Sequence, residues 1–215
     1  MYEFVRGPLL WVTFIVFFGG MIYRVAALVS LSLKKDRVVY NHASGSWALR
    51  SIVHWLLPLN RTAVQYPVYA IVAYIFHICL LIVPVFLLAH NILWDESWGI
   101  SLWSLPEDVA DYTTLVMLAA CLFLIIRRAV LPYVKIVTTP VDYVLLVAVA
   151  LPFLTGYIAY HQWLEYKTML IIHILSGELM LVLIPFTKLM HMMLFFLSRA
   201  HIGMEFGQRR GTVTW

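Results

Sequence analysis

Residues 168–197 read TMLIIHILSGELMLVLIPFTKLMHMMLFFL, thirty residues in which only Glu178 and Lys188 carry a formal charge. A helix of this length crosses the hydrocarbon core of a bilayer, which is about 30 Å thick. His173 and His191 interrupt the apolar run eighteen residues apart. Eighteen residues make about five helical turns, so a straight helix places both imidazoles on one face, about 27 Å apart. The spacing therefore predicts one embedded histidine near each side of a membrane.

The rest of the chain is equally apolar. Of its 215 residues, 63% are hydrophobic and 12% are charged, and the mean hydropathy is +0.88. A soluble domain of this size needs more charged surface, so the composition indicates an integral membrane protein. The segments long enough to span are residues 9–33, 68–93, 112–134, 141–160 and 168–197. We therefore predict an all-α, five-helix transmembrane bundle that forms a single domain over residues 1–215.

The distribution of charge predicts the orientation. Twelve of the fifteen Lys and Arg residues lie between the first two spans, from the last turns of the third span to the start of the fourth, or from the last turns of the fifth span onward. The opposite side carries most of the acidic residues. By the positive-inside rule, the N-terminus lies outside and the C-terminus is cytoplasmic, as a multi-pass protein of the cytoplasmic (inner) membrane.

Two segments on the cytoplasmic side have their own patterns. Residues 46–57 place apolar side chains at helical spacing, which predicts an interfacial helix anchored by Trp47 and Trp55 and ended by Pro58. Residues 206–215 are polar and contain glycine. We expect this tail to contact a partner or to be disordered.

Four histidines lie in the second and fifth spans: His77, His90, His173 and His191. A lone embedded histidine is commonly a neutral side chain bonded to a neighbouring helix, but four at comparable depths favour metal ligation. In the predicted orientation, His77 and His191 share the cytoplasmic leaflet, and His90 and His173 share the outer one. Two imidazoles fill both axial positions of a haem iron, which suits electron transfer. We expect these four histidines to be the axial ligands of two b-type haems.

The position of His90 leaves an alternative open. His77 and His90 are thirteen residues apart, about 140° in azimuth on a straight helix. Pro84 lies between them and can supply the kink that turns both toward the fifth span. Without that kink, His161 at the outer end of the fourth span would replace His90. The carboxyl of Glu178 either bonds locally as the neutral acid or carries protons.

A family resemblance rests on the fifth span. The segment IPFTKLMH at residues 184–191, with His173 upstream, resembles the fifth helix of the respiratory nitrate reductase gamma subunit, a five-helix dihaem cytochrome b. The wider spacing of His77 and His90, with LAHNIL at 88–93 and SLPE at 104–107, is similar to cytochrome b subunits in membrane redox complexes of sulfate-reducing organisms.

This resemblance implies a quinone-linked electron conduit, the quinol-oxidising or quinone-reducing subunit of an oxidoreductase complex. Quinone or menaquinone would react near the outer haem, and electrons would pass to or from a cytoplasmic iron–sulfur subunit resembling heterodisulfide reductase or the nitrate reductase beta subunit. Groups on the outer side that could take quinol protons are Asp95, Glu96, His161 and Lys167. Membrane lipid and quinone are the other expected partners. No nucleic-acid partner is expected.

Two other functions remain open at this level. One is a cytochrome b membrane anchor of a hydrogenase or formate dehydrogenase complex, although such anchors usually have four spans. The other is a haem-free transporter or membrane scaffold. A transporter would need polar, broken spans around a cavity, whereas the embedded polar groups here are mainly histidines.

Overall fold

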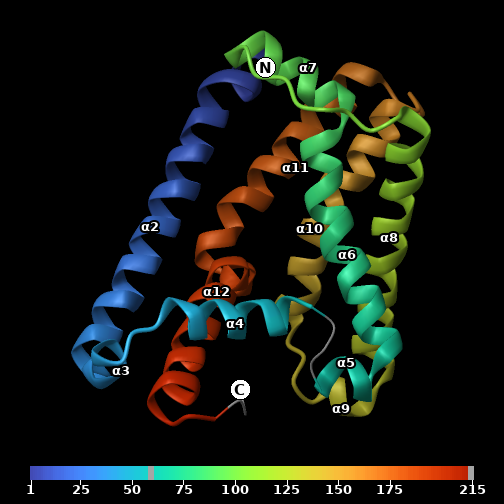
Figure 1. Cartoon of the computed structure of the whole chain (residues 1–215). Coiled ribbons are helices and arrows are strands. Elements are labelled where there is room, and N and C mark those ends of the chain that lie inside the picture. Colours follow the sequence, from blue (N-terminus) through green and yellow to red (C-terminus); the bar gives the residue numbers. More distant parts are fainter. Residues whose placement is uncertain (58–60, 213–215) are drawn as a thin grey trace. The chain divides into compact units, whose positions relative to one another are not determined.

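The computed structural model describes residues 1–57 and 61–212, and this part of the chain contains helices and connections but no β-strand (Figure 1). The elements are α1 (Tyr2–Phe4), the π-helix η1 (Val5–Leu9), α2 (Leu10–Lys35), α3 (Arg37–Asn41), α4 (Gly45–Leu56), α5 (Arg61–Gln65), α6 (Pro67–Phe86), α7 (Leu88–Trp98), α8 (Glu107–Val130), α9 (Pro132–Lys135), α10 (Pro140–Tyr160), α11 (Tyr166–Phe186), the 3-10 helix η2 (Lys188–Met190), α12 (His191–Ile202) and the π-helix η3 (Gly203–Arg209).

The prediction of an all-α protein with five spans is confirmed. In the described residues, five helical segments are long and apolar enough to cross a membrane: Tyr2–Lys35, Pro67–Phe86, Glu107–Val130, Pro140–Tyr160 and Tyr166–Phe186. Large apolar side chains on these helices point away from the protein, as at Ile15, Leu81 and Leu122. Lipid tails are as apolar as these side chains, so such a surface is stable in a bilayer. The side of the membrane on which each end lies stays a prediction.

The second span is shorter than predicted. It ends at Phe86 rather than near residue 93, and Leu87 has extended backbone angles of φ −72° and ψ 131° before α7 begins. Pro84, inside the last turn of α6, has no N–H to donate and disfavours continued helix. The departure from a straight helix is therefore a complete break at Leu87, three residues after the predicted kink at Pro84, and His90 lies on α7.

The fifth span is also interrupted, which corrects the prediction for residues 168–197. The helix ends at Phe186, directly after Pro185, and Thr187 is extended at φ −126° and ψ −173°. The 3-10 helix η2 follows, and His191 begins the separate helix α12 (Figure 1). His173 and His191 are therefore on different helices, so the single straight helix from which the common face and the 27 Å spacing were predicted is not present.

The chain divides into two compact units. Unit 1 comprises residues 1–5 and 68–180, and unit 2 comprises residues 6–67 and 181–215. Unit 1 therefore holds His77, His90, His161 and His173, whereas unit 2 holds His191. The single-domain organisation stays a prediction.

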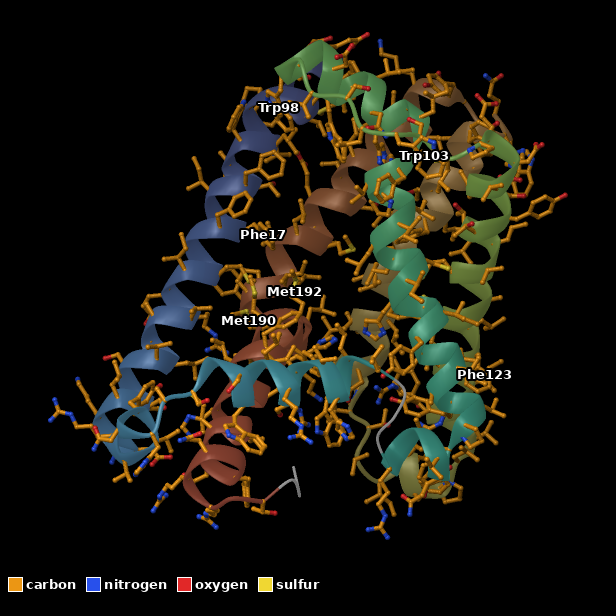
Figure 2. The ribbon with its side chains drawn as sticks, viewed as in Figure 1. Phe17, Trp98, Trp103, Phe123, Met190 and Met192 are labelled. Atoms are coloured by element: carbon orange, nitrogen blue, oxygen red, sulfur yellow. The ribbon has the colours of Figure 1, made fainter. Side chains whose placement is uncertain are left out.

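Within unit 1, α8 and α10 pack along each other. Three of their buried residues are small, which favours close packing of two helices: Ala120, Cys121 and Ala148. The loop before α8 is held against the end of α6, where the ring of Trp103 lies 6.0 Å from that of Phe86 (Figure 2). These contacts fix the end of unit 1 at which His90 and His161 lie.

Within unit 2, α4 is covered by the C-terminal segment. The predicted helix over residues 46–57 is present as α4, but one face packs against α12 and η3. The Cα of Gly203 comes so close that a Cβ built there would lie 2.5 Å from the Trp47 carbonyl oxygen. The guanidinium of Arg199 lies 3.8 Å from the ring centre of Trp55. Trp47 and Trp55 thus contact protein, in addition to any lipid anchoring.

The tail is also more ordered than predicted. Residues 206–209 belong to η3, and a Cβ on Gly207 would overlap the Trp47 ring. Glu205 accepts hydrogen bonds from Arg209 and Arg210 at 2.8 Å, which lower the pKa of its carboxyl. The expectation of a disordered tail is therefore wrong as far as Arg209, and residues 213–215 lie outside the described residues.

Candidate functional site

His90 and His173 come together in unit 1, although they are far apart in the sequence. Their ring centres are 6.0 Å apart and their ring planes differ by 19°. Two metal–nitrogen bonds of about 2 Å, plus about 1 Å from each nitrogen to its ring centre, give a spacing of about 6 Å across one metal ion. The observed distance equals this estimate, and the two ring planes are close to parallel.

The break between α6 and α7 positions His90. A helix end leaves its last carbonyl groups without N–H donors from the next turn. At the end of α6 three such oxygens find other donors: His90 Nδ1 bonds Pro84 at 2.8 Å, Asn91 Nδ2 bonds Val85 at 3.3 Å, and the Leu105 amide bonds Phe86 at 2.8 Å. The ring of His90 is thus held by the C-terminal end of α6.

His173 is held from α10, across the interface with α11. Its Nδ1 lies 2.9 Å from the carbonyl oxygen of Pro152 and 3.4 Å from Thr155 Oγ. Gly156 provides the space, because a Cβ there would lie 2.9 Å from Cε1 of the His173 ring. The Ser176 hydroxyl donates to the His173 carbonyl at 2.7 Å. The backbone of α10 therefore determines where this imidazole points.

The hydrogen bonds also determine which nitrogen can bind a metal. A carbonyl oxygen only accepts, so Nδ1 carries the hydrogen in both rings, and the lone pair of the neutral imidazole is on Nε2. No hydrogen bond to either Nε2 is found within the described part of the chain. Metal-bound histidines commonly donate their other N–H to a backbone carbonyl in this way. The donor set therefore fits a haem iron.

The residues after His173 leave room beside it. A Cβ on Gly177 would meet no atom within 4 Å, although Gly177 is one turn from His173 on the same helix. Small residues such as Gly177 allow a flat ring or another helix to approach this face closely. Glu178 is 5% exposed, and within the described residues neither carboxyl oxygen has a hydrogen-bond partner. The local bonding expected as one possibility for Glu178 is not found there.

His77 and His191 are each oriented in the same manner. Nδ1 of His77 bonds the Ala73 carbonyl at 2.7 Å, and Nδ1 of His191 bonds the Lys188 carbonyl at 2.9 Å. All four predicted ligands therefore direct Nδ1 to the backbone. His77 belongs to unit 1 and His191 to unit 2, so their predicted pairing stays a prediction.

His161 is bonded differently from these four. Its Nε2 donates to the Asp111 carboxylate at 2.8 Å, and its ring lies 4.3 Å from that of Tyr157. The structure thus brings His90, rather than the alternative His161, against His173. The remaining outer-side groups named from the sequence, Asp95, Glu96 and Lys167, lie on α7 and at the start of α11.

Sequence reasoning missed Gly156, Thr155 and the Pro152 carbonyl. A glycine in the apolar fourth span was the available signal, because glycine in a spanning helix often marks a close approach. The residue that would approach it could not be identified, because Pro152 and His173 lie 21 positions apart.

Comparison with known proteins gives one relationship. No family model and no solved structure matches the chain. A protein of Nitratidesulfovibrio vulgaris (strain Hildenborough) is 40% identical over 219 residues, which cover 100% of this chain and 97% of that protein. The name of this relative states no activity, cofactor or partner. The chain described above is a member of the same protein family as this Nitratidesulfovibrio vulgaris protein.

Proposed function

We propose that the protein is a membrane cytochrome b that binds haem between His90 and His173. The observation that carries this proposal is the 6.0 Å spacing of two imidazole rings whose Nδ1 atoms both bond backbone carbonyls. Neutral imidazoles oriented in this way present Nε2 as a ligand. Both rings are half-buried, and His173 lies in one of the apolar spans.

Each part of the site has a stated role in this proposal. The Pro84 and Pro152 carbonyls fix the orientation of the two rings, and Gly156 lets His173 lie against α10. A haem with two histidine ligands supplies one-electron transfer without an open coordination position. The chain then holds this group at a fixed depth in the membrane.

The wider function follows the family resemblance. We propose that His77 and His191 are ligands of a second b-type haem, and that the protein exchanges electrons between a quinone and a cytoplasmic iron–sulfur subunit. The support is the IPFTKLMH segment and the orientation of His77 and His191 by Nδ1–carbonyl bonds. The cytoplasmic membrane is the location that this proposal requires.

One observation favours a second, haem-free candidate. His90 Nδ1 satisfies a carbonyl at the end of α6, so the histidine could serve only to cap that helix in a membrane scaffold. Glutamine separates the two candidates, because its amide donates a hydrogen bond but does not replace imidazole as a haem ligand. His90→Gln therefore keeps a possible cap and removes the ligand.

The test is an absorption spectrum of the purified protein, with haem extracted and counted. We expect reduced b-type bands and about two haems per chain, since two ligand pairs are proposed. His90→Gln and His173→Gln should each remove about half of the haem, whereas His161→Gln should remove none. A colourless wild-type protein would refute the proposal, and full haem content in His90→Gln would leave the capping function.

A further inference from the structure

The Asp111–His161 pair is a titratable cluster that the haem site does not use. It lies at the end of unit 1 where α8 begins and α10 ends. The two side chains are 2.8 Å apart, and they are 23% and 30% exposed, respectively. A pair this accessible can exchange protons with water.

The hydrogen bond fixes which nitrogen of His161 can act as a base. An ionised carboxylate only accepts, so Nε2 of His161 carries the hydrogen that Asp111 binds. The lone pair of the neutral ring is then on Nδ1, and within the described residues no hydrogen bond to this atom is found. A carboxylate that orients an imidazole and stabilises its protonated form is the arrangement used by general bases.

Acidic and aromatic side chains surround the ring. Asp111 is joined on the first turns of α8 by Glu107 and Asp108, and Glu107 accepts a hydrogen bond from the Tyr160 hydroxyl at 3.1 Å. From α10 and the connection after it, the rings of Tyr157, Tyr160 and Trp163 lie within 4.3 to 5.8 Å of the His161 ring centre. The next charged or titratable side chains along the chain are Glu165, Tyr166 and Lys167.

The carboxylate of Glu165 accepts hydrogen bonds from the backbone amides of Lys167 and Thr168, at 3.0 and 2.6 Å. These bonds lower the pKa of the Glu165 carboxyl. Within the described residues, Asp111 is the carboxylate found in hydrogen-bond contact with His161.

The pair is also close to the proposed haem site. Gly156, against which the His173 ring packs, precedes His161 by five residues on α10, about 7.5 Å along the helix axis. Tyr157 bridges this interval, since it follows Gly156 and its ring lies 4.3 Å from that of His161. The base is thus one to two helical turns from the redox centre and on the more exposed side of it.

We propose that His161, oriented by Asp111, accepts a proton from a membrane hydroquinone oxidised beside His90 and His173, and passes it to water. This proposal rests on the proposed function. Oxidation of a hydroquinone to the quinone breaks two O–H bonds and yields two protons and two electrons. One proton goes to Nδ1 of His161 and then to solvent, the second leaves to water, and the electrons leave singly to one-electron acceptors.

The experiment measures how fast a short-chain naphthohydroquinone reduces the purified protein, followed by absorbance under anaerobic conditions from pH 5 to 8.5. Loss of a general base typically slows a step by about 10²-fold or more, and we expect a slowing of this size in His161→Gln. Protonation of His161 removes the lone pair that acts as the base, so the wild-type rate should fall as the pH is lowered, whereas the rate of the variant should not. Asp111→Asn should reduce the rate less.

Tyr160→Phe is the matched control, because it removes a hydrogen bond to Glu107 at the same helix end and leaves the pair intact. All variants should keep the wild-type haem content and chemically reduced spectrum. A second readout is independent of haem: ¹⁵N NMR of the histidines should show a hydrogen on Nε2 and none on Nδ1 of His161 at pH 8.

A haem-containing His161→Gln protein with the wild-type rate and pH profile would overturn the inference and leave the proposed function intact. A colourless wild-type protein would overturn both. If His161→Gln and Asp111→Asn both failed to fold, the pair would have a structural role, which would also overturn the inference.

Discussion

Replacing Gly156 by alanine places one methyl group against the His173 ring. The new Cβ would lie 2.9 Å from Cε1, whereas carbon atoms in contact prefer about 3.5–4.0 Å, so the ring edge must move by about 0.6–1.1 Å. The same atom would lie 3.1 Å from Nδ1, which bonds Pro152. The movement therefore disturbs both the 6.0 Å ring spacing and the hydrogen bond that sets the tautomer.

The effect on folding should be small, but the effect on haem should be large. Alanine is favoured over glycine in a helix by about 1 kcal/mol, which offsets much of an overpacking cost of about 1–3 kcal/mol. Disturbing a hydrogen bond behind a metal ligand typically costs 10–100-fold in metal affinity. We expect Gly156→Ala to lose the haem of His90 and His173 during purification while its helical content and melting temperature stay close to wild type.

The assay is extracted haem per chain, together with the reduced absorption spectrum. Gly19→Ala is the control, because it makes the same substitution in another spanning helix where a Cβ meets no atom within 4 Å. Full haem content in Gly156→Ala, with an unchanged spectrum, would refute the assignment of His173 as an iron ligand in this geometry.

Three further predictions concern the framework around the site. Gly203→Ala should destabilise the packing on α4 by about 1–3 kcal/mol, since its Cβ would lie 2.5 Å from the Trp47 carbonyl oxygen; faster limited proteolysis of the C-terminal segment would show this. Asn91→Ala should raise the hydrogen-exchange rate of the Leu102 amide, which now donates to the Asn91 side chain at 3.0 Å. Glu205→Gln should lower the melting temperature at neutral pH but not in acid. The pKa of the Glu205 carboxyl is lowered in the folded protein, so its ion pairs stabilise the fold fully above the ordinary pKa of glutamate. This contribution to stability is lost as the pH falls through the lowered pKa.

Each of these predictions has a control or a contrary outcome. Gly45→Ala introduces a Cβ with no neighbour within 4 Å on α4 itself and should leave proteolysis unchanged. Unchanged exchange at Leu102 would mean that the loop is held by Phe86 and Trp103 alone. A melting difference for Glu205→Gln that persisted in acid would show that the charge of Glu205 is not responsible.

The sequence by itself determined the membrane class, the number of spanning segments and a helix predicted over residues 46–57, which the structure has at Gly45–Leu56. Each of these depends on the free energy of a short segment in lipid or at its surface, which the local pattern of apolar side chains reports. It also identified Pro84 as the place where the second span departs from a straight helix, because proline lacks the donor that continuation requires. It did not show whether a proline would bend a helix or end it, as Pro185 illustrates.

Tertiary structure alone decided which groups meet. The ring of His173 is set by a carbonyl and a glycine of α10, and that of His90 by the carbonyls left free at the end of α6. The residues that pack on α4 likewise come from η3, about 150 residues later in the chain. Hydrophobic periodicity fixes how deep a side chain lies and on which helix, but a directional bond depends on the position of an acceptor brought in from a distant segment. The 6.0 Å spacing between His90 and His173 is therefore a property of the fold, since no interval along the sequence encodes it.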